Sequence, residues 1–200
     1  MTLTTEQGAL YRATTSPQII EVPDVTYLMI DGMGPPDGEE FELAMRALYQ
    51  VSFSVRGEIV LSRTRAATPL EALWGPSCAP VPAGRHSSWR WTLMLPNAAL
   101  PLQVLADRLA DAVGRARHLL PPLPVDDVYV ARLREGRCVQ AMHVGSYADE
   151  PATIARMLAH ADARGLTPRG RHHEIYLSDP NQTAPQWLRT IVRLPVAPQR

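Results

Sequence analysis

The first strong pattern along the chain runs from Ile19 to Asp31, where β-branched and aromatic residues predominate and Pro23 interrupts them. Because proline cannot donate a hydrogen bond within a sheet, this run predicts a strand or two strands around a bulge. Apolar residues then recur every three or four positions from Glu39 to Val51, behind three glutamates in the first turn. This spacing predicts an amphipathic helix with acidic residues at its positive end.

The middle of the chain alternates short β-branched or aromatic runs with loops rich in proline and glycine. We predict strands at 57–61, 69–74 and 89–95. The apolar stripe from Leu102 to Leu120 predicts the clearest helix of the chain, which three prolines then end. Strands at 128–133 and 138–144 are expected to form a hairpin that turns at Glu135 and Gly136.

The last part of the chain continues the same alternation. Asp149 is expected to cap a helix that has Pro151 in its first turn and ends at Gly165. Strands at 172–179 and 188–196 follow it.

The two halves of the chain show the same order of elements: a strand ending in glycine, an amphipathic helix, a short strand containing Glu, and a final strand. This order predicts an α+β fold of tandem pseudo-twofold βαββ repeats, with the helices on one face of an antiparallel sheet. We expect one domain over 1–200, with repeat one at about 19–96, a connecting helix at 102–120 and repeat two at about 126–197. A groove between such repeats is a common ligand site.

Composition narrows the class of function. The chain has 200 residues, of which 46% are hydrophobic and 20% charged, and its formal net charge is zero, which is typical of a globular protein. A neutral chain is a poor general nucleic-acid binder. The sequence has no lysine, which excludes Schiff-base chemistry and a P-loop lysine. We expect a cytoplasmic monomer or homodimer, because no apolar run suits a membrane span and no secretory signal is evident.

The segment HHEIYLSDP, at 172–180, is the most informative for chemistry. Strand alternation places Glu174 and Tyr176 on one face, and Ile175 and Leu177 on the other, where they would pack under the helices. A carboxylate beside an aromatic ring in a half-buried groove suits a cation or a proton transfer, and burial there would raise its pKa. The alternative is a surface strand with a solvated glutamate.

Other candidate side chains gather around this predicted groove. Glu71 holds in the first repeat the place of Glu174 in the second, so the two would form a like-charged pair, unless Glu71 is simply exposed at a strand end. Trp74 and Trp91 either line an aromatic pocket or fill the core. His143 could join a metal site with His172 and Glu174, but the spacing lacks the usual ligand motifs, so neither a metal nor a cofactor is expected.

These motifs resemble the family of stand-alone GyrI-like small-molecule-binding proteins, which are similar to the effector-binding domains of multidrug-responsive activators. The matching stretches lie in order between Ser16 and Val196 and include IIEVPDVTYLMIDG, PLEALW, WRWTLML, CVQAMHVGSYADEPATIARM and HHEIYLSDPNQTAPQWLRTIVRLPV. The family loop usually reads GDPN where this chain has Gly34-Pro35-Pro36-Asp37, and such departures leave the identity of the ligand open.

The resemblance implies a tandem βαββ fold with a central groove that binds bulky, often cationic aromatic compounds, with Glu174 in the groove. Some stand-alone members resemble hydrolases that open the cyclopropane of DNA-alkylating natural products. On that basis we expect Glu174 as general base and Tyr147 or Tyr176 as proton donor, with Glu71, Trp74, Trp91, His143 and Tyr176 as ligand contacts. A sequestering or sensing protein, or an inhibitor of a protein partner such as gyrase, is the alternative.

Overall fold

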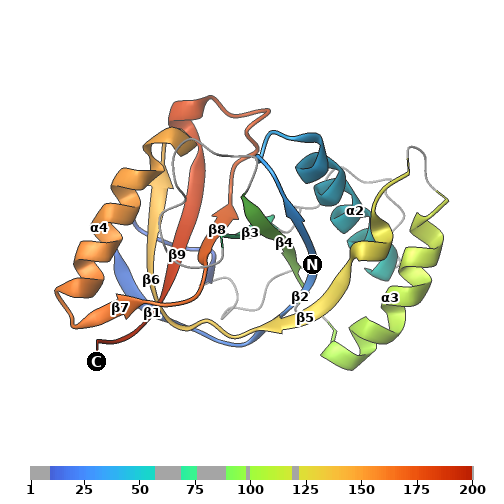
Figure 1. Cartoon of the computed structure of the whole chain (residues 1–200), viewed down its shortest axis with the longest axis horizontal. Helices are drawn as coiled ribbons and strands as arrows, with labels where there is room; N and C mark the ends of the chain where they lie inside the picture. The colour runs from blue at the N-terminus through green and yellow to red at the C-terminus, as the bar shows by residue number, and fades with distance from the viewer. Residues whose placement is uncertain (1–9, 57–68, 76–88, 98–99, 119–121, 200) are drawn as a thin grey trace. The chain divides into compact units, whose positions relative to one another are not determined.

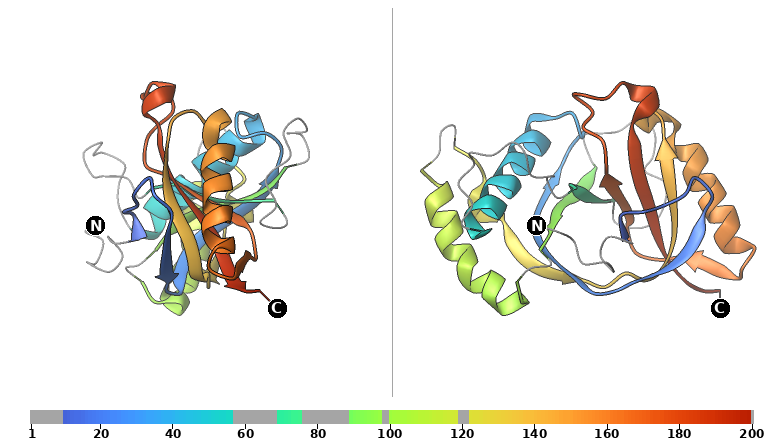
Figure 2. Two further views of the ribbon diagram at one scale, coloured as in Figure 1. Left: turned by 90° about the vertical axis from the view of Figure 1, so that its left-hand side faces the viewer. Right: turned by 180° about the vertical axis from the view of Figure 1, so that it is seen from behind.

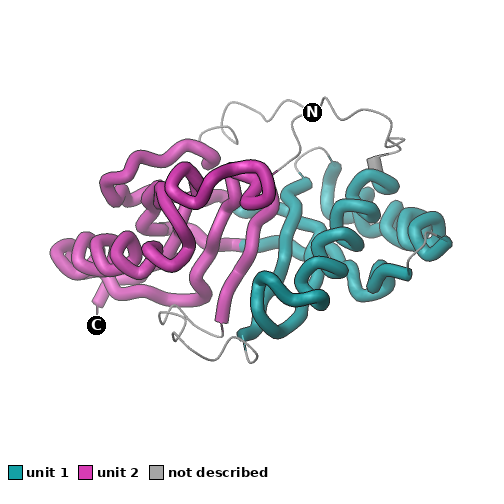
Figure 3. Tube along the Cα trace, turned by 90° about the horizontal axis from the view of Figure 1, so that it is seen from above, with its two compact units in different colours: residues 1, 24–68, 83–133 teal, residues 2–23, 69–82, 134–200 magenta. Residues whose placement is uncertain are grey.

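The computed structural model of the chain describes residues 10–56, 69–75, 89–97, 100–118 and 122–199. The chain divides into two compact units, coloured teal and magenta in Figure 3. Unit 1 takes its described residues from 24–68 and 83–133, and unit 2 from 2–23, 69–82 and 134–200. Both units combine helices with antiparallel strands, so the predicted α+β class is confirmed.

The described part of unit 1 is built on three antiparallel strands and two long helices. Its strands are ordered β4 (Arg90–Pro96), β2 (Val25–Met33), β5 (Tyr129–Leu133), and its helices are α2 (Glu39–Arg56) and α3 (Leu102–Ala116). A short 3-10 turn, η2 (Val125–Asp127), precedes β5. The buried core of the unit joins strand residues such as Leu28 and Leu93 to helix residues such as Leu48 and Leu105. The helical spacing read from the sequence therefore marks the buried side of both helices.

Among its described residues, unit 2 contains the larger number of strands and one long helix. Its strands are ordered β1 (Gln18–Val22), β6 (Gly136–Val144), β9 (Arg189–Pro198), β8 (His172–Tyr176), β3 (Glu71–Trp74), with β7 (Leu166–Pro168) also paired to β9. The helix is α4 (Glu150–Asp162), and short 3-10 turns lie at η3 (Tyr147–Asp149) and η4 (Pro185–Trp187).

Helix α4 lies along β6 and β9, as Figures 1 and 2 show. Its residues Ile154 and Met157 pack with Val139 of β6 and with Val192 of β9 in one buried cluster. Glu174 is paired across the strands with Val192, and paired residues share a face of an antiparallel sheet. Glu174 therefore lies on the face that α4 covers.

Several predicted elements differ from the observed ones. The run at 19–31 is two separate strands: β1 pairs with β6, whereas β2 pairs with β4 and β5. The predicted hairpin of the strands at 128–133 and 138–144 is wrong, because both edges of β6 are occupied by β1 and β9, while β5 pairs with β2. A strand can pair along only two edges, and in β6 both edges pair with strands that are distant in the sequence.

The remaining differences are local. Strand β7 was not anticipated, and helix α3 ends at Ala116 rather than at Leu120. The strand expected at 57–61 lies outside the described residues. The relation between the two halves as tandem repeats stays a prediction. Among the described helices, none combines the length with the apolar character that spanning a bilayer requires.

Candidate functional site

The candidate site lies where the start of α4 meets β8 in unit 2. Glu150 is the first residue of α4, and strand alternation along β8 points His172, Glu174 and Tyr176 to the same side. His172 Nε2 lies 3.1 Å from Glu150 Oε1 and 3.4 Å from Glu174 Oε1. The side chains of these three residues are only 4%, 7% and 12% exposed, respectively, so the cluster is largely withdrawn from water.

The two carboxyl groups of this cluster share a proton near neutral pH. Burial raises the pKa of Glu174 to about 8, and the neighbouring Glu150 carboxylate raises it further. Burial likewise raises the pKa of Glu150 to about 7, although its hydrogen bond with Glu174 acts in the opposite direction. A hydrogen bond between two carboxyl groups requires a proton on one of them. The increase that we predicted for the pKa of Glu174 is confirmed.

The histidine of the cluster does not supply a positive charge. Burial lowers the pKa of His172 below its ordinary value, more than the nearby Glu174 carboxylate raises it. His172 Nε2 is buried and, among the described residues, has no hydrogen bond of good geometry. Within the part of the chain that the structure describes, the cluster is thus a pair of acids without a matched cation, and a buried group without a full set of hydrogen bonds is a feature of functional sites.

Aromatic side chains surround the carboxyl pair. The hydroxyl of Tyr176 is hydrogen-bonded to Glu174 and accepts a 3.1 Å hydrogen bond from Trp74 Nε1. Tyr147 stands edge-on to Tyr176, with 6.1 Å between ring centroids, and is 40% exposed. Burial, with the charges of Glu174 and Glu150, raises the pKa of Tyr147 to about 12, so its hydroxyl stays protonated and able to donate.

The predicted ligand contact His143 has a different position. Its Nδ1 lies 3.1 Å from Thr153 Oγ1 on α4, and its Nε2 lies 2.9 Å from the carbonyl oxygen of Ser146. His143 therefore ties the segment between β6 and α4, which carries Tyr147, to the helix. A contact between His143 and a ligand stays a prediction.

Glu71 is not the second carboxylate beside Glu174, and the predicted pairing of these two acids is wrong. Strand β3 pairs with β8 so that Ala72 is opposite Glu174 and Glu71 is opposite Ile175, which places the two glutamates on opposite faces. Glu71 is fully buried, with Oε2 2.9 Å from His173 Nε2 and Oε1 accepting a 2.6 Å hydrogen bond from Tyr11. Glu150 takes the place that was predicted for Glu71.

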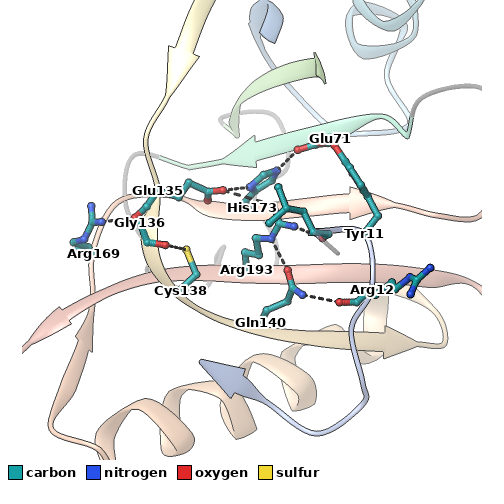
Figure 4. Close-up of polar contacts among 11 residues, drawn as sticks. Tyr11, Arg12, Glu71, Glu135, Gly136, Cys138, Gln140, Arg169, His173 and Arg193 are labelled. Atoms are coloured by element: carbon teal, nitrogen blue, oxygen red, sulfur yellow. Dashed lines mark hydrogen bonds and ion pairs between the residues drawn. The ribbon is translucent and has the colours of Figure 1, made fainter. Parts of the chain in front are cut away.

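Glu71 belongs instead to a buried network on the face of the sheet opposite the candidate site, drawn in Figure 4. His173 lies between Glu71 and Glu135, with its Nδ1 3.0 Å from Glu135 Oε2. Arg193 NH1 lies 3.8 Å from the same Glu135 oxygen, and its guanidinium also donates to the side chain of Gln140. We call Tyr11, Glu71, Glu135, His173 and Arg193 the His173 network. Its charges pair inside the protein.

Trp91 lies in unit 1, where it is 1% exposed. Its ring stands edge-on to Phe41, with 5.2 Å between centroids, and packs against the backbone at Gly32. A Cβ atom at Gly32 would lie 2.1 Å from the indole, so this position requires glycine. Trp91 thus occupies the core of unit 1, and its contact with a ligand stays a prediction.

Glu150 is the residue of the candidate site that the sequence analysis missed, although a signal for it exists. Helix residues Ile154, Met157 and Ala161 are buried against the sheet, and Glu150 precedes Ile154 by four positions, which puts it on the same face.

The prediction that Ile175 and Leu177 pack under the helix is wrong. These two residues lie with Tyr11 and Met142 in a cluster on the face of the sheet away from α4.

A metal ion is a further occupant to consider at this cluster. Glu150, His172 and Glu174 each offer one ligand atom, and these atoms lie within 4.8 Å of one another. Two carboxylates and an imidazole are ligand types that zinc and manganese accept. The hydrogen bond between the two glutamates accounts for the same proximity through a shared proton.

Comparison with known proteins agrees with this architecture. The family model described as the GyrI-like small molecule binding domain matches residues 120–197. The chain is similar to a crystallised hydrolase from Listeria innocua, with 33% identity over 98% of both chains and a TM-score of 0.80. A second structure from Listeria innocua, an uncharacterized conserved protein, matches with the same identity and coverage and a TM-score of 0.81.

A more distant structure shares the fold alone. The C-terminal domain of EcmrR matches with 10% identity, over 92% of this chain and 98% of that domain, and a TM-score of 0.58. Among curated proteins, none matches this chain.

Proposed function

This chain belongs to the family of GyrI-like small-molecule-binding domains, and on that premise we propose that it binds a planar or cationic aromatic molecule beside Glu150 and Glu174 and hydrolyses electrophilic ones. The observation that carries the proposal is the buried pair of carboxyl groups, bordered by Tyr147 and Tyr176, for which the described residues supply no matched cation. A hydrolase at 33% identity over nearly the whole chain supports the catalytic part.

The same carboxyl pair would favour positively charged ligands over neutral ones. A buried carboxylate has lost hydration, which a positive ligand offsets through charge pairing. The rings of Tyr147 and Tyr176 present π-electron density to such a ligand. Binding of a cation would displace the shared proton, because the charged ligand stabilises both carboxylates in their ionised forms.

For hydrolysis we assign Glu174 as the general base on water. In a cyclopropane conjugated to a carbonyl group, the water oxygen bonds to a ring carbon while one ring C–C bond breaks. The electron pair of that bond moves to the carbonyl oxygen, and the proton of the attacking water passes to Glu174. A base whose pKa lies near the working pH is well matched to this task.

Tyr147 is assigned as the donor to the oxygen on which negative charge develops. The hydroxyl of Tyr176 accepts from Trp74 and is hydrogen-bonded to Glu174, so it is already engaged within the protein. The more exposed Tyr147 lies next to Tyr176 and holds its proton at neutral pH. Donation to a developing oxyanion stabilises the transition state more than the ground state.

The test compares Glu174→Gln with wild type against a cationic and a neutral planar aromatic of matched size. The substitution keeps the shape but removes the charge and the base, so cation affinity should fall by about 5- to 150-fold while neutral affinity stays nearly unchanged. With a cyclopropane-containing alkylating compound, kcat should fall by roughly 10²- to 10⁴-fold. Glu71→Gln, on the opposite face, is the control and should affect both assays less.

Two outcomes would redirect this proposal. Loss of cation affinity without measurable turnover in the wild type would favour a protein that sequesters or senses its ligand. Equal, small effects of Glu174→Gln on both ligands would refute the role of Glu174. Both assays are run with and without EDTA. If EDTA abolishes activity and zinc restores it, the result would indicate that a metal ion, rather than a shared proton, is bound by Glu150, His172 and Glu174.

A further inference from the structure

We infer that Arg171 and Trp74 are positioning residues for Glu174: they hold the Tyr176 hydroxyl in place, and through it the carboxyl group that faces Glu150. The inference rests on the proposed function only for what Glu174 does, and not for how it is held. Neither residue needs to touch the reacting atoms. Trp74 is 3% exposed, so its indole is enclosed by protein rather than open to solvent.

The direction of the hydrogen bonds follows from chemistry. An indole N–H can only donate, so in the 3.1 Å contact between Trp74 Nε1 and the Tyr176 hydroxyl the phenolic oxygen is the acceptor. The Tyr176 hydrogen is then free to point at Glu174, to which this hydroxyl is also bonded. Donation from Trp74 makes the Tyr176 O–H a stronger donor, because hydrogen bonds in a chain polarise one another.

Arg171 fixes the backbone on both sides of Trp74. Its Nε donates to the carbonyl oxygen of Gly75 and its NH2 to that of Leu73, each at 2.7 Å. These carbonyl groups belong to the residues immediately before and after Trp74, so one planar guanidinium brackets the indole-bearing residue. The chain leaves the strand at once, because Gly75 has a left-handed φ of 67°.

Strand β3 needs this second anchor because it is short. It has four residues, and Trp74 is the last of them, opposite His172 in β8. A strand end opens more readily than a strand centre, and a small movement of the indole would break its bond to Tyr176. Arg171 directly precedes β8, so the bracket ties the end of β3 to the start of the strand that carries Glu174.

The other groups that face Glu174 must be separated from this effect. Glu150 comes from α4, His172 and Tyr176 from β8, and Tyr147 from η3. Trp74 carries no charge, whereas Arg171 carries a positive charge whose removal would by itself raise the pKa of Glu174. Loss of Trp74, or loss of the Arg171 bracket with the positive charge kept, should therefore act on Glu174 through the Tyr176 hydroxyl, which stabilises the ionised carboxylate.

The experiment measures the pKa of Glu174 by ¹³C NMR of the carboxyl carbon, with the signal assigned by its loss in Glu174→Gln. The variants are Trp74→Phe, Arg171→Lys, which keeps the positive charge but not the planar fork, and the double variant. Arg164→Lys is the matched control, because Arg164 also donates to a backbone carbonyl, that of His160, but at the far end of α4. No ligand is needed, so the result is independent of whether the proposed function holds.

Each single variant should raise the Glu174 pKa by about 0.5 to 1, because the ionised carboxylate loses part of its donor, and Arg164→Lys should leave it unchanged. The double variant should raise it no more than Trp74→Phe alone, since Arg171 acts through Trp74. Additive shifts, or no shift in Trp74→Phe, would overturn the inference. Arg171→Met, which removes the charge as well as the bracket, should give a larger shift in the same direction.

A second readout separates failure of this inference from failure of the proposed function. The pH dependence of affinity for a planar cationic dye should move upward with the Glu174 pKa in both single variants. If the NMR shift occurs but Glu174→Gln leaves dye affinity unchanged, the positioning role stands and the proposed function fails. If the dye binds through Glu174 but the pKa does not move in the variants, the positioning role fails alone.

Discussion

On one side of the β3–β8 pair, Glu150 and Glu174 lie beside a histidine that burial keeps neutral; on the other side, Glu71 and Glu135 lie beside His173 and Arg193. Both clusters are withdrawn from water and both contain two glutamates and one histidine. They differ in their positive charge. Counted over the described residues, the His173 network has two cationic groups for its two acids, and the candidate site has none.

The pKa values of the adjacent residues His172 and His173 shift in opposite directions because of this difference. Burial alone lowers the pKa of a histidine, and it does so for His172. For His173 the charges and hydrogen bonds of Glu135 and Glu71 outweigh burial and raise the pKa to about 9. Of these two neighbours in one strand, His172 is therefore neutral and His173 positive at neutral pH, because strand alternation points them to opposite faces.

The comparison distinguishes a cluster whose charges are matched from one whose charges are not. In the His173 network the charges satisfy one another, which holds the segment containing Tyr11 against the sheet. In the candidate site the charge stays unmatched and a proton is held in its place. A protein tolerates such an arrangement where a ligand or a reaction uses it.

The largest expected effect is on stability, from removing the central cation of the His173 network. His173→Leu leaves Glu71 and Glu135 buried without their shared partner, and breaking a buried ion pair in this way costs about 3–5 kcal/mol. The free energy of unfolding at pH 7, from urea denaturation followed by circular dichroism, measures this loss. His172→Leu is the matched control and should change stability by about 1 kcal/mol or less, because His172 is neutral. Equal losses in the two variants would contradict the comparison.

An effect of the order of a few kcal/mol is expected in the pH dependence of stability. In Glu150 and Glu174 the folded pKa values, about 7 and 8, lie above the ordinary 4.5. The folded state therefore holds protons that the unfolded state has released, and stability falls as pH rises from about 4.5 to 8. Glu174→Gln should flatten this decline, as measured by urea denaturation between pH 5 and 8.

His173 adds a decline in a higher pH window. Its folded pKa of about 9 lies above the ordinary 6.5, so its contribution is complete below pH 6.5 and is lost as pH rises through 9. Glu174→Gln should leave the decline between pH 8 and 9 in place. A Glu174→Gln profile that parallels wild type from pH 5 to 8 would show that the site does not hold the extra proton.

The smallest effect is expected from two tyrosines on opposite sides of the comparison. Tyr11→Phe removes a 2.6 Å hydrogen bond to the buried Glu71 carboxylate and should cost about 1–2 kcal/mol of stability without changing ligand affinity. Tyr147→Phe should leave stability nearly unchanged, since Tyr147 is 40% exposed, and should lower turnover instead. Denaturation and turnover assays on both variants check this. Loss of turnover in Tyr11→Phe together with loss of stability in Tyr147→Phe would contradict the roles given to the two clusters.

Much of the local structure follows from the sequence. The periodicity of apolar residues predicted the helices α2, α3 and α4 and most strands. Burial of one side of a helix or strand requires apolar residues at a fixed spacing, and this spacing can be read within a short stretch of sequence. The alternation in HHEIYL likewise placed Glu174 and Tyr176 on one side of β8, as observed. These local patterns, together with the family motifs, were enough to predict the α+β class and to select Glu174 as a candidate site residue.

The tertiary structure decided which groups meet. Periodicity does not say which strand takes the edge of β6, so the sequence suggested a hairpin that the sheet does not contain. It does not say that Glu150 rather than Glu71 faces Glu174, or that Tyr11 reaches Glu71 across 60 residues of sequence. These contacts depend on how distant segments pack, and the charge states of His172 and His173 follow from them, because a pKa is set by surroundings in space.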